Sequence, residues 1–158
     1  MKKWIFGVVL LLIVGYVYYL FSLIEGNNSR DKAFESAQSI AYNYVGLQNP
    51  KDFYMYRGKE DWDVITGENR NGTKIAVWVP LNKKNKTFSL PLKSGIKKEE
   101  ALEVLKQNRE PFKIIHTKLG CDKDTPLWEI TYLNVRDKLC YFYVDFRTGE
   151  WLKSYDNL

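Results

Sequence analysis

Residues capable of acid–base, nucleophilic or metal chemistry are few in this chain and far apart in its sequence. There is one histidine, His116, and there are two cysteines, Cys121 and Cys140. A nucleophile with its base, or a metal cluster, needs several such groups together, and no H-E-x-x-H, C-x-x-C, G-x-S-x-G or phosphate-binding glycine loop occurs. We therefore expect no catalytic residue, no metal site and no cofactor, and interpret His116 as a residue of a strand.

The carboxylate pairs Asp61 with Asp63 and Glu99 with Glu100 are the remaining groups that could transfer protons. Isolated acidic pairs more commonly lie on solvated faces, or at a helix start, where they favour the positive end of the helix dipole. The sequence therefore predicts a protein that binds rather than an enzyme.

Tyrosine and tryptophan are the most unusual part of the composition. Both combine a large apolar area with a polar group, which is why they dominate protein-binding hot spots. Most are expected to fill the core. Those that alternate outward on predicted strands are candidate partner-binding residues, or residues of a seam between two parts of the fold: Tyr54, Tyr56, Tyr141 and Tyr143.

Two cysteines are too few to hold a small domain together by disulfides. Cys121 and Cys140 are expected near neighbouring strands of one sheet, but the geometry that a bridge requires cannot be obtained from sequence. Both a disulfide and two separate thiols remain open.

An uncharged, mostly apolar run extends from Trp4 to Ile24. As a helix these 21 residues would be roughly 31 Å long, enough to cross the hydrocarbon core of a bilayer. Lys2 and Lys3 precede the run, so the positive-inside rule predicts a cytoplasmic tip (residues 1–3), a transmembrane helix (4–24) and an extracytoplasmic remainder. A cleaved signal peptide is the alternative, but its apolar region is normally shorter and ends in small residues.

The predicted extracytoplasmic part, residues 25–158, carries a mild positive charge. It holds all 19 acidic residues and 22 of the 24 basic ones, a net charge of about +3. No clustered basic stripe marks a nucleic-acid binder. An acidic cell wall polymer remains a candidate ligand.

Two similar repeats are predicted after a polar spacer at residues 25–30. The first covers residues 31–92, with a helix that begins near Ser29 or Asp31 and ends before Gly46. The second covers residues 93–158, with a helix over 97–107. Each helix precedes segments rich in β-branched and aromatic residues, predicted as strands at 52–57, 61–67, 74–79 and 87–92, and then at 112–119, 125–133, 139–146 and 150–155.

Several details of these strands follow from pattern alone. Aligning Trp62 with Trp128, an offset of 66 residues, matches neighbouring positions and indicates a duplication. In the second repeat, Trp128, Ile130, Tyr132, Cys140, Phe142, Val144 and Phe146 are expected on one face, with Glu129, Thr131, Tyr141, Tyr143 and Asp145 on the other. Asn71-Gly72 predicts a type I′ hairpin turn. The fold class is therefore α+β, with each helix packed on a three- to four-stranded antiparallel sheet.

Particular sequence segments resemble a known family. In order they are Asp52-Phe53-Tyr54-Met55-Tyr56-Arg57-Gly58, Ala76-Val77-Trp78-Val79-Pro80, Gly95-Ile96-Lys97-Lys98-Glu99-Glu100-Ala101, Thr125-Pro126-Leu127-Trp128-Glu129-Ile130-Thr131-Tyr132, and Tyr143-Val144-Asp145-Phe146-Arg147-Thr148-Gly149-Glu150. Together with the N-terminal anchor they resemble the TseB-like cell wall elongation regulators of Gram-positive bacteria. Lys97 departs from the family pattern, in which a serine often caps the second helix.

The resemblance implies PepSY-like (cystatin-like) repeats and a non-catalytic role. It implies a single-pass protein of the cell membrane that regulates cell wall elongation by binding a penicillin-binding protein or another envelope enzyme. Two alternatives remain: inhibition or modulation of an envelope peptidase, as PepSY domains of protease propeptides imply, and direct binding of a cell wall polymer.

Overall fold

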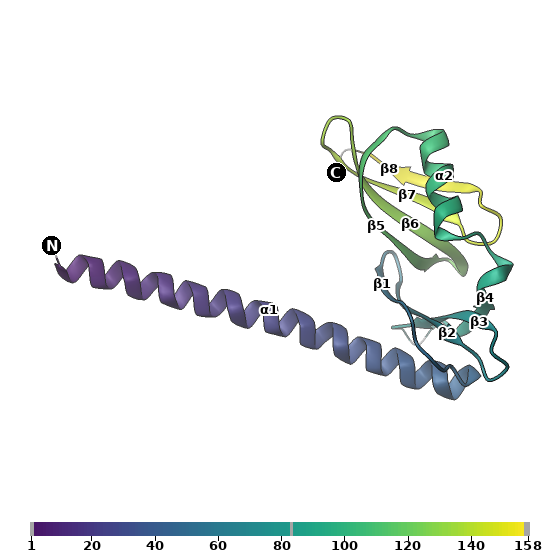
Figure 1. Ribbon diagram of the computed structural model, residues 1–158, viewed down its shortest axis with the longest axis horizontal. Coiled ribbons are helices and arrows are strands. Elements are labelled where there is room, and N and C mark those ends of the chain that lie inside the picture. Colours follow the sequence, from purple (N-terminus) through teal and green to yellow (C-terminus); the bar gives the residue numbers. More distant parts are fainter. Residues whose placement is uncertain (1, 83, 157–158) are drawn as a thin grey trace. The chain divides into compact units, whose positions relative to one another are not determined.

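The computed structural model describes residues 2–82 and 84–156, and within the first helix it describes the side chains of residues 9–19 and those from residue 28 onward. The chain divides into two compact units, Met1–Ser36 and Ala37–Leu158. Helix α1 (Lys2–Val45) makes up the first unit and contributes its last turns to the second, which contains both sheets (Figure 1).

Helix α1 is continuous through residues 25–30, so the prediction of a non-helical spacer and of a new helix start at Ser29 or Asp31 was wrong. The glycine and asparagines in this stretch each cost up to about 1 kcal/mol in a helix relative to alanine. Once a helix has formed, however, each further residue adds a hydrogen bond without a new nucleation cost. No proline interrupts the chain before Pro50, so nothing blocks this propagation.

The predicted membrane span, residues 4–24, lies partly outside the described residues, which include the side chains of residues 9–19 of it. Those side chains are all exposed. Among the helices as described, none is both long and apolar enough to cross a membrane.

The first repeat forms a four-stranded antiparallel sheet in the order β1-β2-β3-β4. Its strands are β1 (Phe53–Arg57), β2 (Asp61–Glu68), β3 (Lys74–Pro80) and β4 (Phe88–Pro91). Ile65 pairs with Val77 on one face, and both are buried, as are Ala37 and Ala41 at the end of α1. Leu47, just after the helix, lies against Gly67 on that same face. The end of α1 therefore covers this face.

The second repeat has the same order of elements. It follows a 3₁₀ turn, η1 (Leu92–Ser94), and contains α2 (Lys98–Asn108), β5 (Pro111–Asp122), β6 (Thr125–Asn134), β7 (Leu139–Asp145) and β8 (Trp151–Tyr155). The sheet order is β5-β6-β7-β8, again antiparallel (Figure 1). Helix α2 packs on this sheet through Ala101 and Leu105, which are fully buried. At its start the Lys97 side chain makes no capping hydrogen bond, and Glu100 accepts the Lys97 backbone N–H instead.

The predicted register of the second sheet is confirmed. Trp128 pairs with Val144 and Ile130 with Phe142 on the face toward α2, while Glu129 pairs with Tyr143 on the opposite face. The element boundaries agree with the predicted ones to within three residues at every strand and in α2. Period-two alternation was sufficient here because one face of the sheet is strongly apolar.

The alignment of Trp62 with Trp128, in contrast, was off by one residue. Trp128 lies on the helix-covered face of its sheet, whereas Trp62 lies on the face of its sheet opposite Ile65 and the helix. An offset of 65 places Ile65 on Ile130 and Val77 on Phe142, all facing the helices. A one-residue slip reverses the face of every side chain, so matching the two tryptophans produced the wrong register.

The turns confirm the 65-residue offset. In both the β2–β3 and β6–β7 turns an asparagine, Asn69 or Asn134, accepts two backbone N–H groups through its side-chain oxygen. Each turn ends with a residue at positive φ, Gly72 at 73° and Asp137 at 58°. Of Asn71 and Gly72 only the glycine is left-handed, so the hairpin is present but its predicted type I′ turn is not. Three loop residues ending in a left-handed residue form the turn instead.

The two repeats share one hydrophobic core. The face of the first sheet that carries Tyr54, Tyr56 and Trp78 packs against strand β5, at the edge of the second sheet. The Trp78 indole N–H donates to the Gly120 carbonyl over 2.8 Å, and the Tyr54 and Trp128 rings meet edge-to-face with centroids 6.4 Å apart. This contact seals an otherwise open sheet edge.

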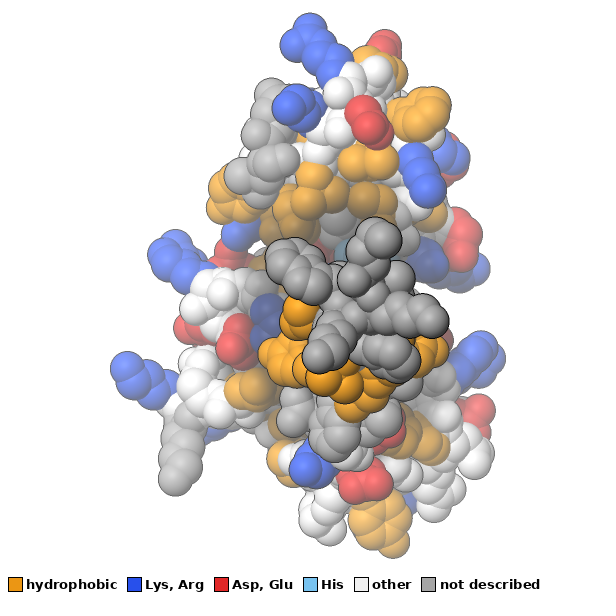
Figure 2. Space-filling view, turned by 90° about the vertical axis from the view of Figure 1, so that its left-hand side faces the viewer, with side chains coloured by type: hydrophobic (Ala, Val, Ile, Leu, Met, Phe, Trp, Pro, Cys, Tyr) orange, Lys and Arg blue, Asp and Glu red, His pale blue; other side chains and the backbone are white. Residues whose placement is uncertain are grey.

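On the face shown in Figure 2, lysine and arginine side chains are interspersed with aspartate and glutamate and form no continuous basic stripe.

Candidate functional site

The four candidate tyrosines occupy three different places. Tyr56 and Tyr143 line one cleft of about 760 Å³, formed where the first repeat meets the second sheet. Tyr54 lines a separate groove of about 430 Å³ with Trp128 and the start of α2. Tyr141 lies further along the second sheet, beside Tyr155 on β8. The structure therefore brings together two of the four.

Tyr56 and Tyr143 are less exposed than outward-facing strand residues would be. Only 2% of Tyr56 and 7% of Tyr143 is accessible. Tyr56 lies against Gly120 of β5, so it belongs to the seam between the repeats. Of the two predicted roles for these tyrosines, a docking surface or a seam between the repeats, Tyr56 fits the seam. Tyr143 lies on the face of its sheet opposite α2, as predicted, and is buried there beside Tyr155.

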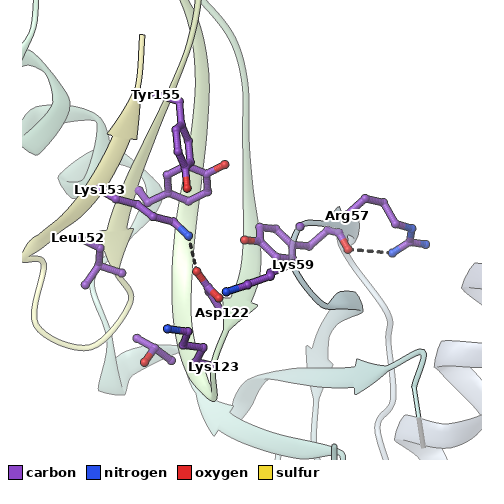
Figure 3. Close-up of a pocket in the computed structure, with 11 residues that line it drawn as sticks. Arg57, Lys59, Asp122, Lys123, Leu152, Lys153 and Tyr155 are labelled. Atoms are coloured by element: carbon purple, nitrogen blue, oxygen red, sulfur yellow. Dashed lines mark hydrogen bonds and ion pairs between the residues drawn. The ribbon is translucent and has the colours of Figure 1, made fainter. Parts of the chain in front are cut away.

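Three segments form the walls of the cleft (Figure 3). The β1–β2 turn contributes Arg57, Gly58 and Lys59. The end of the β5–β6 hairpin contributes Asp122, Lys123 and Thr125, and β8 contributes Leu152, Lys153 and Tyr155.

Local geometry explains why these residues face the cleft. Lys123 and Asp124 have φ values of 49° and 63°, the two left-handed positions of a two-residue hairpin turn. Tyr143 of β7 pairs with Lys153 of β8, and the next residue, Val144, pairs with Trp151, so Leu152 is an extra residue in β8. Such a bulge re-aims side chains, and here Leu152 and the adjacent Lys153 both line the cleft.

The cleft is positively charged. Among its lining residues Arg57, Lys59, Lys123 and Lys153 are basic and only Asp122 is acidic. Arg57 is held by Asp63 at 2.8 Å, outside the cleft, and Lys153 pairs with Asp122. Figure 3 shows Lys59 extending toward the same carboxylate. Within the described residues, no hydrogen bond or ion pair engages the ammonium groups of Lys59 and Lys123.

A buried ion pair lies behind the tyrosines. Glu129 on β6 is 4% exposed, and its Oε1 forms an ion pair with Nζ of Lys118 on β5 at 2.9 Å. Burial, followed by the Glu129 charge and a hydrogen bond to it, raises the pKa of Tyr143 far above its usual value. Burial and the same carboxylate also raise the pKa of Tyr56. Both phenols are therefore neutral at physiological pH.

The groups that could do other chemistry lie outside the cleft. His116 is exposed on β5, opposite Thr131. Cys121 and Cys140 are buried free thiols on strands that are not neighbours, and burial raises the pKa of Cys121 to about 12. In the described part of the chain, no three histidine, cysteine, aspartate or glutamate side chains converge as a metal site would require.

Most of the cleft residues were not predicted from sequence. Arg57, Lys59, Lys123 and Lys153 look like ordinary solvated charges, and nothing local distinguishes them from the other lysines. The one available signal was Lys123-Asp124, which stands between two alternating strands where a hairpin turn is expected but Asn-Gly or Asp-Gly is not found. Such a turn is unusual and marks these two residues for attention.

Comparison with known proteins gives consistent results. The solved YpmB protein from Bacillus subtilis matches with a TM-score of 0.72 and 33% identity, over 77% of this chain and 95% of that chain. A family model described as "Cell wall elongation regulator TseB-like domain" matches residues 36–80, from the end of α1 through β3. The "Probable cell wall elongation regulator TseB" of B. subtilis strain 168 is 31% identical over 152 residues, 95% of this chain and 92% of that protein. This chain belongs to the TseB-like cell wall elongation regulator family. The predicted family resemblance is thereby confirmed. This member has two four-stranded antiparallel sheets, each packed with a helix.

Proposed function

We propose that this protein is a non-catalytic, membrane-tethered regulator that acts outside the cytoplasm by binding an enzyme of cell wall elongation. The observation that carries the proposal is 31% identity, over nearly the whole chain, to a probable regulator of cell wall elongation. A regulator without its own chemistry acts through a binding surface, and the cleft between the repeats supplies one.

The cleft is suited to binding. Its tyrosine rings offer rigid contact area together with hydroxyl groups, and its lysines are available to a partner. Two helix-and-sheet repeats joined through one core hold these groups in place, which lowers the ordering cost of association. We interpret the repeats as PepSY-like.

The tether is the uncharged run of residues 4–24, whose helical length of roughly 31 Å suits a bilayer. With Lys2 and Lys3 on the cytoplasmic side, the two sheets lie outside. Anchoring the protein beside a membrane-bound enzyme raises the effective concentration of each for the other, so a modest interface suffices. The proposed partner is a penicillin-binding protein.

Affinity capture from cross-linked membranes tests the proposal. The full chain, carrying a C-terminal tag, should recover a penicillin-binding protein well above the level seen with an unrelated single-pass protein of equal abundance. Recovery of an envelope peptidase in its place would point to the inhibitor function, and sedimentation with purified cell wall, weakened by salt, would point to polymer binding. Either result without a cell wall synthase would contradict the proposal.

The topology has its own test. A C-terminal reporter that matures only outside the cytoplasm should be active, and one that works only inside should be silent. Exchanging Lys2 and Lys3 for glutamate should lower the fraction inserted in this orientation, because these charges bias the helix. Activity of the cytoplasmic reporter in the native chain would refute the extracytoplasmic role.

A further inference from the structure

Among its described lining residues the cleft has more basic than acidic side chains, Arg57, Lys59, Lys123 and Lys153 against Asp122. Lys59 comes from the β1–β2 turn and Lys123 from the β5–β6 turn, so the two repeats each supply one ammonium group to one opening. Asp122, the one acidic residue among the described lining residues, already pairs with Lys153 (Figure 3). This arrangement favours an anionic ligand.

The same cleft also has an apolar wall. Leu152 is 42% exposed and Tyr155 is 49% exposed, and both line the cleft beside the buried ring of Tyr143. They lie on β8, an edge strand of the second sheet, whose outer side pairs with no strand among the described residues. Exposed apolar side chains beside an open strand edge are features that extended peptides use.

We propose that this cleft binds an acidic peptide segment of a protein partner, whose carboxylates contact Lys59 and Lys123 and whose apolar side chains contact Leu152 and Tyr155. That the segment belongs to a protein rests on the proposed function, in which the chain binds an envelope enzyme. The cleft thus specifies the chemistry of the contact.

The apolar wall distinguishes a peptide from a phosphate polymer. A polymer with phosphate groups would satisfy the lysines but would leave Leu152 and Tyr155 uncovered. An acidic peptide satisfies both, because its side chains alternate and its backbone can lie along β8.

The backbone at Lys123 is a second observation. Lys123 has a φ of 49°, in the left-handed region that disfavours residues with a Cβ, and asparagine or glycine would relieve much of this strain. Residues in strained conformations cluster at binding sites, where the strain positions a functional side chain. Here the strained residue is one of the two lysines whose ammonium groups have no hydrogen-bond or ion-pair partner among the described residues.

Binding is measured with the full chain in non-ionic detergent micelles, by fluorescence anisotropy of a labelled peptide that alternates Glu and Leu, with empty micelles as baseline. Two competitors are compared: the same peptide with Gln for every Glu, and inorganic polyphosphate of equal charge. The acidic peptide should bind and compete, and the Gln peptide should compete at least tenfold more weakly. Competition by polyphosphate that equals that of the acidic peptide would overturn the proposal in favour of a polyanion site.

Charge reversal locates the site. The double variant Lys59→Glu with Lys123→Glu should weaken peptide binding about tenfold or more, because two exposed attractions become repulsions. The control, Lys113→Glu with Lys138→Glu, makes the same change of net charge at the opposite end of the second sheet and should alter binding less than twofold. Equal loss in both pairs would show a non-specific charge effect and refute the cleft.

Two single variants separate binding from folding. Lys123→Asn should leave thermal stability equal or higher, because it relieves the left-handed strain, while it weakens peptide binding severalfold. Leu152→Ala should weaken binding. Val135→Ala, which truncates a more exposed apolar residue in the β6–β7 turn, should not. Unchanged binding in both Lys123→Asn and Leu152→Ala would sink the proposal.

These outcomes are independent of membrane capture. If the peptide binds the cleft but no cell wall synthase is captured, the acidic-peptide site stands and the proposed function falls. If the Lys59 and Lys123 double variant captures the synthase as well as the native chain does, the function stands and the site is wrong.

Discussion

Replacing Gly120 with alanine should break the seam between the two repeats at a single point. A Cβ at this position would lie 2.2 Å from Cδ2 and 2.5 Å from Cγ of the Tyr56 ring. Favourable carbon contacts are about 3.5–4.0 Å long. The overlap involves the base of a buried ring, which cannot turn away as a flexible chain end would. Moving β5 instead would strain the 2.8 Å hydrogen bond from Trp78 to the Gly120 carbonyl.

The expected cost is about 2–3 kcal/mol, the upper part of the range for overpacking, because more than 1 Å of relief is required. For a unit of this size that corresponds to a fall in melting temperature of roughly 6–12 °C. Tyr56→Ala alone removes a large buried ring and should cost about 3–5 kcal/mol. In the double variant the added methyl group has room, so Gly120→Ala should then cost almost nothing, a coupling of about 2 kcal/mol.

Thermal and urea unfolding of the full chain, followed by tryptophan fluorescence, measures all three variants. Lys113→Ala, an exposed change in the same strand, is the control and should shift the free energy of unfolding by less than about 0.5 kcal/mol. A Gly120→Ala protein as stable as the native chain would refute the packing argument. Additive effects of the two substitutions would show that Tyr56 and Gly120 are not in contact.

Three further predictions concern buried groups. Cys121 and Cys140 should not react with a thiol reagent at pH 8 in the folded protein, and two thiols should appear on unfolding; one fast thiol in the native state would contradict their burial. Lys118→Ala should lower the free energy of unfolding by about 2–4 kcal/mol, because it leaves the Glu129 charge buried without its partner. Adding Glu129→Gln should recover part of that loss. No recovery would exclude the ion pair as the cause. Because the pKa of Tyr143 is raised in the folded protein, the contribution of its phenol to the free energy of unfolding is complete below pH 10, where the unfolded phenol is also protonated, and is lost as the pH rises above 10. Tyr143→Phe should therefore make the stability to urea fall less steeply between pH 10 and 11. An unchanged slope would contradict the raised pKa.

The elements and faces of this fold were accessible from sequence because they depend on local pattern. Alternation in β6 and β7 predicted which side chains face α2, and the pairs Trp128 with Val144 and Ile130 with Phe142 agree. Propensity was a weaker guide where it competed with cooperativity. Residues 25–30 look unfavourable for a helix, yet α1 runs through them because extending a formed helix is easier than ending it without proline.

The hairpin turns show where local pattern misleads. Asn71-Gly72 has the preferred residues for a type I′ turn but forms a three-residue loop, while Lys123-Asp124 has neither and adopts two successive left-handed residues. Strand register, set by packing of whole faces, decided how many residues each turn had to contain.

Composition, periodicity and charge were sufficient to predict two helix-and-sheet repeats and their strands. The resemblance of particular sequence segments indicated the family of regulators to which the chain does belong. Neither was sufficient to predict the cleft. Tyr56 is buried, and Lys59 and Lys123 line one opening, because a face of the first sheet packs on the edge of the second. That contact joins residues more than 40 positions apart, and no periodicity within a single strand carries information about it.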